Sequence, residues 1–112
     1  MTSDEKVQVA NIILNQLGGR RFMAFTGTKQ PVALNTKDYA YGGLRLKLAR
    51  NKASATHLII TLNSMDTYDM KFVRVRLTGS EYSETTVLEH NGVYDDMLAS
   101  IFESETGLYT KF

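Results

Sequence analysis

The N-terminal segment repeats its apolar positions with the period of an α-helix. Apolar residues recur at the i, i+3, i+4, i+7 spacing that places side chains on one helix face. They are Ala10, Ile13, Leu14 and Leu17. Ser3 can cap this helix, and Gly18-Gly19 can end it. The pattern predicts a helix over residues 3–17 with one apolar face.

The middle of the chain changes to a period of two, which is typical of strands with one wet face. Leucines at positions 44, 46 and 48 alternate with basic residues, and Val73, Val75 and Leu77 alternate with two arginines. We expect strands over residues 20–26, 44–48, 57–62, 67–77 and 85–89. The stretch from Gly27 to Gly43 is either a functional loop or hides a short strand at residues 32–34.

The C-terminal segment returns to a helical pattern. Asn91-Gly92 can open this helix and Gly107 can end it. The side chains that share one face are Tyr94, Leu98, Ile101, Phe102 and Glu105. The order of elements predicts a single α+β domain over residues 1–112. We expect a mostly antiparallel sheet of four to six strands, flanked by an N-terminal and a C-terminal helix.

The amino-acid composition limits the cellular compartments in which we expect the protein to act. The chain of 112 residues has no cysteine, which removes disulfides, thiolate zinc sites and thiol nucleophiles. It begins with acidic residues, where a secretory signal would be basic, and its longest purely apolar run, residues 22–25, is far too short to cross a bilayer. We therefore expect a cytoplasmic protein without a membrane segment and without a cofactor.

Charge is unevenly distributed along the chain. Residues 20–76 hold 11 basic and three acidic residues, whereas residues 77–112 hold one basic and seven acidic residues. Such asymmetry is typical of proteins with a polyanionic partner. It also fits two halves whose charges intermix on the folded surface, or an acidic surface kept for a protein partner.

A basic stripe is the candidate nucleic-acid surface. Arg45 and Lys47 point away from the leucines of their strand, and Arg74 and Arg76 point away from the valines of theirs. If these strands are close, the four cations share one face, and aromatic rings between them could stack on bases. The full candidate set is Arg20, Arg21, Arg45, Lys47, Arg50, Lys52, Tyr68, Arg74 and Arg76. The alternative is a solvated polar face that discourages aggregation.

The 27–43 segment is the candidate surface for a protein partner. It contains the only proline, Pro31, and two nearby tyrosines, Tyr39 and Tyr41. An exposed apolar patch there would mark a site of protein interaction.

Catalytic motifs are few. The chain has two histidines and lacks the G-x-S-x-G, H-E-x-x-H and EF-hand patterns. Asp69-Met70-Lys71 has the D-x-K spacing of metal-dependent nucleases, which need another carboxylate, here Asp38 or Asp66, to hold Mg²⁺. This spacing is short enough to arise by chance, so we expect neither a metal site nor an enzyme.

Two sequence blocks resemble a known family. LGG-x-x-F-x-A-x-TG near the N-terminus and FE-x-ETGLY at the C-terminus are similar to small proteins encoded in bacteriophage and prophage gene clusters. The resemblance runs from about Val9 to the C-terminus and implies a mobile-element product in a bacterial cytosol, without an assigned activity. We expect an interaction protein that binds a host protein, a phage protein or itself. Single-stranded nucleic acid is the alternative partner.

Overall fold

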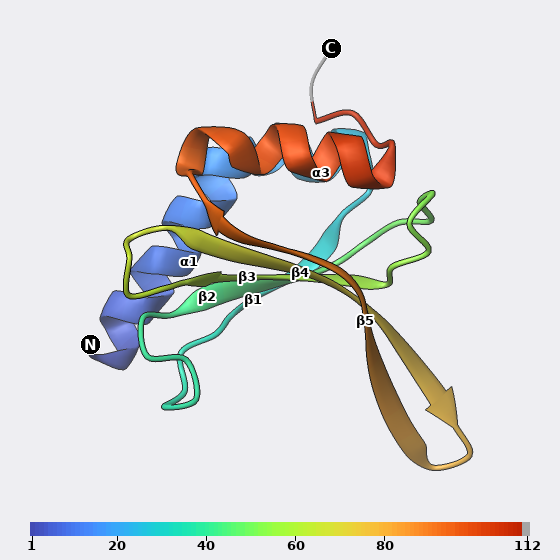
Figure 1. Ribbon diagram of the computed structural model, residues 1–112, viewed down its shortest axis with the longest axis horizontal. Coiled ribbons are helices and arrows are strands. Elements are labelled where there is room, and N and C mark those ends of the chain that lie inside the picture. The colour runs from blue at the N-terminus through green and yellow to red at the C-terminus, as the bar shows by residue number, and fades with distance from the viewer. Residues whose placement is uncertain (111–112) are drawn as a thin grey trace.

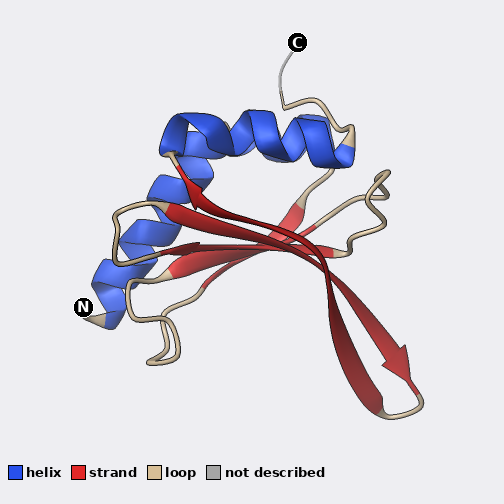
Figure 2. Cartoon of the chain, in the orientation of Figure 1, coloured by secondary structure: helices blue, strands red, loops and turns tan. Residues whose placement is uncertain are grey.

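The computed structural model describes residues 1–110, which form helices, a single sheet and a closing helix (Figure 2). The helices are α1 (Ser3–Leu17), α2 (Gly19–Thr26), the short 3₁₀ helix η1 (Asp95–Met97) and α3 (Leu98–Thr106). The strands are β1 (Lys29–Ala33), β2 (Gly43–Lys47), β3 (His57–Leu62), β4 (Tyr68–Thr78) and β5 (Glu81–Val93).

The five strands form one antiparallel sheet in the order β1-β2-β3-β4-β5, which is also their order along the chain. The helices all lie on one side of this sheet (Figure 1). The predicted α+β class, with a mostly antiparallel sheet flanked by terminal helices, is therefore confirmed. Within the described residues, no helix is long and apolar enough to span a membrane.

The side of the sheet that carries the helices, here called the covered face, forms the hydrophobic core. Alternate residues of the central strands point toward the helices because side chains alternate along a strand. Those that are fully buried are Leu46, Leu58, Ile60, Met70 and Phe72. They pack in one cluster with residues of all three α-helices, including Ile13, Phe22 and Phe102. The rings of Phe22 and Phe102 meet edge to face with their centroids 4.9 Å apart, which ties α2 to α3.

The first helix has the predicted span, but its cap differs from the prediction. Thr2, not Ser3, is the N-cap, since its hydroxyl accepts from the Glu5 backbone N–H while the Glu5 carboxylate accepts from the Thr2 N–H. This reciprocal capping box satisfies two backbone donors that the first turn would otherwise leave unpaired. Gly18 ends the helix as predicted.

The expected strand over residues 20–26 is wrong, because this segment is helix α2. Its two buried residues, Phe22 and Thr26, are four positions apart, which places them on one helix face. The Thr26 hydroxyl donates to the Phe22 carbonyl, and Phe22 fills the core. The many aromatic and large residues favoured a strand, but tertiary packing of Phe22 favours the helix.

The stretch between Gly27 and Gly43 contains a strand, as one of the two alternatives predicted. Strand β1 begins three residues earlier than expected, and it pairs with β2 across a register shift between Lys29 and Val32. The remaining segment, residues 34–42, crosses to the side of the sheet opposite the helices. We call it the 34–42 loop.

Two C-terminal boundaries differ from the predictions. Strand β5 runs over Glu81–Val93 rather than residues 85–89, so Asn91 and Gly92 belong to the strand and do not open the helix. Helix α3 begins at Leu98 and ends at Thr106, with Gly107 as its C-cap, as predicted for its end. The extended β5 arises because its long partner β4 provides backbone partners from Tyr68 to Thr78.

Candidate functional site

The side of the sheet opposite the helices, here called the open face, has no covering element among the described residues (Figure 1). One row of register partners crosses it from β2 to β5: Arg45, Ile59, Lys71 and Glu89. A second row pairs Lys29, Lys47 and His57 across β1, β2 and β3. Basic, acidic and apolar side chains therefore mix on this face, as expected for a surface in contact with water.

The far half of the β4–β5 hairpin, residues 74–85, extends beyond the rest of the sheet on the side away from the helices (Figure 1). We call it the hairpin arm. Leu77 and Tyr82 are cross-strand partners on the arm, and they are 58% and 76% exposed. The base of the arm approaches the open face, since Glu84 Oε1 lies 3.7 Å from an Arg45 guanidinium nitrogen on β2.

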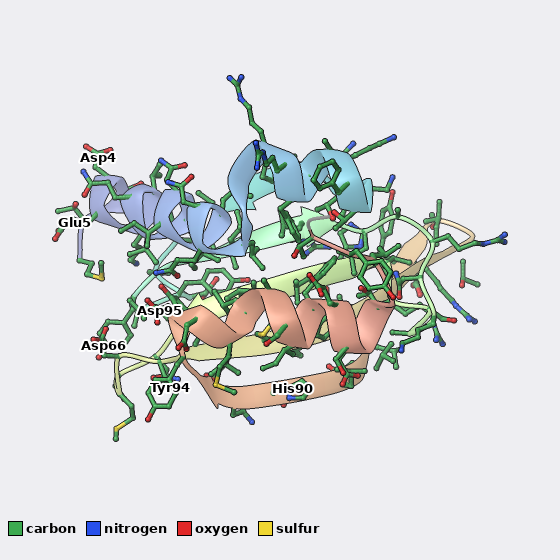
Figure 3. The ribbon with its side chains drawn as sticks, turned by 90° about the horizontal axis from the view of Figure 1, so that it is seen from above. Asp4, Glu5, Asp66, His90, Tyr94 and Asp95 are labelled. Carbon is green, nitrogen blue, oxygen red and sulfur yellow. The ribbon has the colours of Figure 1, made fainter. Side chains whose placement is uncertain are left out.

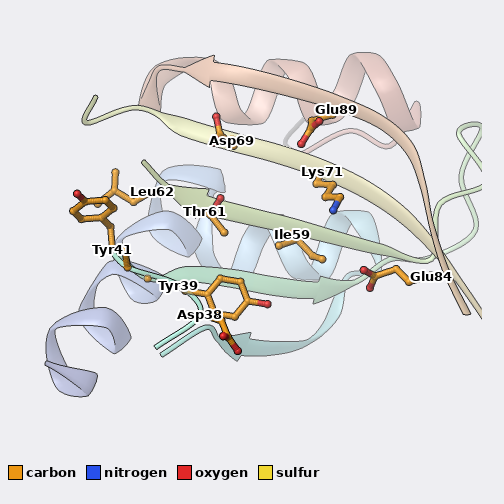
Figure 4. Close-up of a pocket in the computed structure, with 12 residues that line it drawn as sticks. Asp38, Tyr39, Tyr41, Ile59, Thr61, Leu62, Asp69, Lys71, Glu84 and Glu89 are labelled. Atoms are coloured by element: carbon orange, nitrogen blue, oxygen red, sulfur yellow. The ribbon is translucent and has the colours of Figure 1, made fainter. Parts of the chain in front are cut away.

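Two adjoining hollows occupy the open face and share Glu84 as a common wall. The first, the loop-side hollow, has a volume of about 410 Å³ and lies between the 34–42 loop and strands β4 and β5 (Figure 4). The second, the arm-side hollow, has a volume of about 450 Å³. Its lining residues are Arg45, His57, Val75, Tyr82, Ser83 and Glu84. We call the two hollows together the groove, which extends from the loop to the arm.

His57 in the arm-side hollow has a depressed pKa. Partial burial is the main cause, and the positive charges of Arg45 and Lys47 add to it, while Glu84 opposes them. The Nδ1 atom of His57 lies 2.8 Å from the Thr56 hydroxyl, which fixes the ring. The imidazole is therefore predominantly neutral at pH 7, and the ring carries little of the positive charge of this face.

The predicted basic stripe is divided between the two faces. Arg45 and Lys47 lie on the open face, but Arg74 and Arg76 alternate with Val73 and Val75 and point to the other side. Arg74 donates from Nε to the Ser54 carbonyl. The expectation that the four cations share one face is therefore wrong. The leucines of β2 point to the covered face, whereas Val73 and Val75 of β4 point to the open face. This follows because the cross-strand partners of the two valines are open-face residues.

The other candidates for nucleic-acid contact are also dispersed. Tyr68 is 8% exposed and belongs to the core, where burial raises the pKa of its hydroxyl. Arg20 and Arg21 are exposed on α2, and Arg50 and Lys52 are exposed in the loop between β2 and β3. The structure therefore brings no aromatic ring among the predicted residues onto the face of Arg45 and Lys47.

The predicted partner-binding residues are partly brought together. Tyr39 and Tyr41 both line the loop-side hollow, whereas Pro31 lies in the edge strand β1 and does not. Lys6 of α1 holds their loop in place, since its buried side chain donates from Nζ to the Thr36 carbonyl at 2.9 Å. Gly42 packs against Lys6 with a φ of 84°, and a Cβ there would lie 3.0 Å from the Lys6 Cα.

The D-x-K residues Asp69 and Lys71 line the loop-side hollow together with Asp38. Asp66 lies instead in another hollow, at the end of the molecule where Tyr94 and Asp95 are found (Figure 3). Asp69 Oδ1 accepts hydrogen bonds from Asn63 Nδ2 and from the Gly92 backbone N–H, so it braces the β3–β4 turn and β5. Within residues 1–110, no three His, Asp or Glu side chains are grouped to hold a metal ion.

The acidic residues at the C-terminal end of α3 have contact partners within the molecule. Glu105 lies 3.4 Å from the Nε2 atom of His90 on β5, and Glu103 accepts from the backbone and hydroxyl of Thr110. The Lys52 backbone N–H donates to the Thr106 carbonyl. These contacts offset the unfavourable placement of carboxylates near the negative end of the helix dipole.

Several residues of the groove did not stand out in the sequence. Tyr82 of the arm-side hollow was not singled out, and neither were Glu84 and Glu89 of the loop-side hollow. Val75 was predicted as a strand residue but not as a site residue, as was Leu77, which lies on the arm outside both hollows. The available signal was the alternation Val73, Val75, Leu77, which continues to the Gly79-Ser80 turn without a covering element to bury it.

Comparison with known proteins adds no assignment: no family model matches the chain, and no curated protein and no solved structure is significantly similar to it. The resemblance to phage and prophage proteins therefore stays a prediction.

Proposed function

We propose that the chain is a non-enzymatic interaction protein of phage or prophage origin that acts in the bacterial cytosol. Its partner is a protein, and the open face and the hairpin arm bind an extended segment of that protein. The segment runs from the 34–42 loop at one end to the arm at the other.

The exposed pair Leu77–Tyr82 is the observation that supports this function most strongly. A two-stranded ribbon is marginally stable in water by itself, and it gains little from two large apolar side chains that face solvent. Aromatic and aliphatic side chains at such positions are typical anchors of protein interfaces. Tyr82 also lines the arm-side hollow, so the anchor and the groove form one surface.

The groove is better suited to binding than to catalysis. The His57 ring, the only imidazole among the described residues that line either hollow, is held by Thr56, and one carboxylate oxygen of Asp69, Oδ1, accepts two structural hydrogen bonds. A nuclease built on Asp69 and Lys71 would need a metal-ligand group, and residues 1–110 hold none.

A selection from a random peptide display library, with the full chain as bait, tests this function. Enriched peptides should bind the wild-type chain, and the double variant Leu77→Ser, Tyr82→Ser should weaken their binding by at least about tenfold, since buried aromatic anchors contribute about 2 kcal/mol or more. The matched control is Met65→Ser, Tyr109→Ser, which removes two large exposed side chains outside the groove and the arm. An empty selection, or equal losses in the two double variants, would contradict the proposal.

Single-stranded nucleic acid is a second candidate, favoured by one observation. Lys29 and Lys47 are direct cross-strand partners beside His57, and within residues 1–110 neither lysine has an ion-pair partner. Like charges directly opposite each other destabilise a sheet, and a bound anion would remove that cost.

Titration with a labelled single-stranded oligonucleotide at low and moderate salt tests the second candidate. Binding that weakens with salt and with Lys29→Ala, Lys47→Ala would support nucleic acid as the partner. The double variant Arg74→Ala, Arg76→Ala is the control, because these two side chains point to the other side of the strand. Absence of binding at low salt would eliminate this candidate.

A further inference from the structure

The loop-side hollow carries an excess of negative charge. Among the described residues, its lining includes four carboxylates, Asp38, Asp69, Glu84 and Glu89, and a single cation, Lys71. Figure 4 shows Asp38 and Tyr39 on one side of the hollow and Asp69 and Glu89 on the other. A phosphate-bearing ligand would be repelled there, whereas a cation would be attracted.

Few of these charges are neutralised by neighbours. Glu84 pairs with Arg45 at 3.7 Å, and Lys71 is the register partner of Glu89 on the adjacent strand. Asp38 and Asp69 have no ion pair within the described residues, and the hydrogen bonds to Asp69 come from neutral groups. Concave surfaces lined by one sign of charge focus the electrostatic field and attract ligands of the opposite sign.

The other lining residues also suit a cationic side chain. Ile59 and Leu62 provide apolar contact for a side-chain stem, and Tyr39 and Tyr41 provide aromatic rings at the loop side. Lys and Arg bury their methylene groups against apolar surface and are attracted to the faces of aromatic rings.

The loop that carries Asp38 and both tyrosines is already ordered by contacts within the chain. The Tyr39 N–H donates to the Thr36 carbonyl and the Gly42 N–H to the Tyr39 carbonyl, at 3.1 and 3.2 Å. The Lys6 side chain holds the same Thr36 carbonyl from the helix side. A wall that is ordered before binding loses less conformational entropy when the ligand arrives.

We infer that the bound segment inserts an arginine or lysine side chain into the loop-side hollow, between Asp38 on one wall and Asp69 and Glu89 on the other. This inference rests on the proposed function and adds the chemistry of the partner. Arginine is the better ligand, since its planar guanidinium can contact two carboxylates at once. The other end of the segment contacts Val75 and Tyr82 in the arm-side hollow.

Peptides from the library selection provide the first test. Enriched sequences should share at least one arginine or lysine. Replacing it with glutamine in a fluorescein-labelled synthetic peptide should weaken binding by at least about tenfold in fluorescence anisotropy, as expected for loss of a charged partner at an interface. Enriched peptides without any basic residue would overturn this inference while leaving the proposed function intact, and an empty selection would overturn both.

A charge-neutral version of the hollow provides the second test. Asp38→Asn, Glu89→Gln should weaken the arginine peptide about tenfold and leave the glutamine peptide unchanged. The control variant Asp66→Asn, Asp96→Asn removes two negative charges outside both the groove and the hairpin arm and should change binding less than about twofold. Equal weakening by both double variants would show long-range attraction only and would overturn the inference.

Discussion

The two faces of the sheet are built from the same strands but differ in how deeply their side chains are buried. On the covered face, Leu46, Leu58, Ile60 and Phe72 are fully buried under the helices. On the open face, most of their immediate neighbours are charged or half-buried, although Val73 next to Phe72 is fully buried, and the hairpin arm leaves Leu77 and Tyr82 in solvent. The comparison teaches that neighbouring positions of one strand serve separate purposes: one side stabilises the fold, and the other is available for a partner.

The largest expected difference between the faces is between two adjacent residues of β4. Phe72→Ala should lower the free energy of unfolding by about 3–5 kcal/mol, because it leaves a cavity in the core. Lys71→Ala, on the open face, should change it by less than about 0.5 kcal/mol. Urea denaturation followed by circular dichroism measures both values. Similar losses from the two substitutions would mean that the open face is also part of the stabilising core.

The contact of the 34–42 loop with α1 links the two faces. Gly42→Ala should lower the free energy of unfolding by roughly 1–3 kcal/mol, since the residue has a positive φ and its new Cβ would press on the Lys6 backbone. Gly79→Ala at the arm tip is the control, because its φ is also positive but its Cβ would meet open space. A Gly42→Ala chain no less stable than Gly79→Ala would show that the loop is not fixed against α1.

The smallest expected effect is the pH response of His57. Its folded pKa lies below the usual value of 6.5, so below pH 6.5 the unfolded chain binds more protons at this residue. Well above pH 6.5, His57 therefore adds no pH dependence to the free energy of unfolding. As the pH falls from 6.5 to the folded pKa, His57 lowers that free energy. In measurements of the free energy of unfolding as a function of pH, His57→Gln should remove that contribution.

The cause of the shift is tested separately by NMR titration of the ring. Arg45→Met should move the His57 midpoint part of the way back up, because the charge of Arg45 is lost while burial remains. A wild-type midpoint at or above 6.5 would contradict the environment described for this hollow.

Local periodicity predicted the elements that bury one clear face. The helix stripe ending at Leu17 and the leucine alternation of β2 both correspond to the core in the structure. Residues 20–26 were misassigned because their two phenylalanines locally favour a strand, whereas the contact of Phe22 with Phe102 across the fold favours the helix.

The groove was harder to predict because its residues meet only through the sheet register and the bend of the arm. Tyr39 and Tyr41 were identified from the unusual length of their segment, but Glu84 and Arg45 are 39 positions apart and approach only in the folded chain. The side on which Arg74 and Arg76 lie depends on the pairing of β4 with β3, which no local pattern reveals.

NMR chemical-shift mapping of the full chain with an enriched peptide tests the central claim most directly. The account predicts that the shifted backbone amides cluster in the 34–42 loop, at Ile59 and Lys71, and along the hairpin arm, while those of α2 and the Arg50–Lys52 loop stay unchanged. Shifts concentrated on α2 or on that loop would contradict it, because the partner would then bind outside the open face.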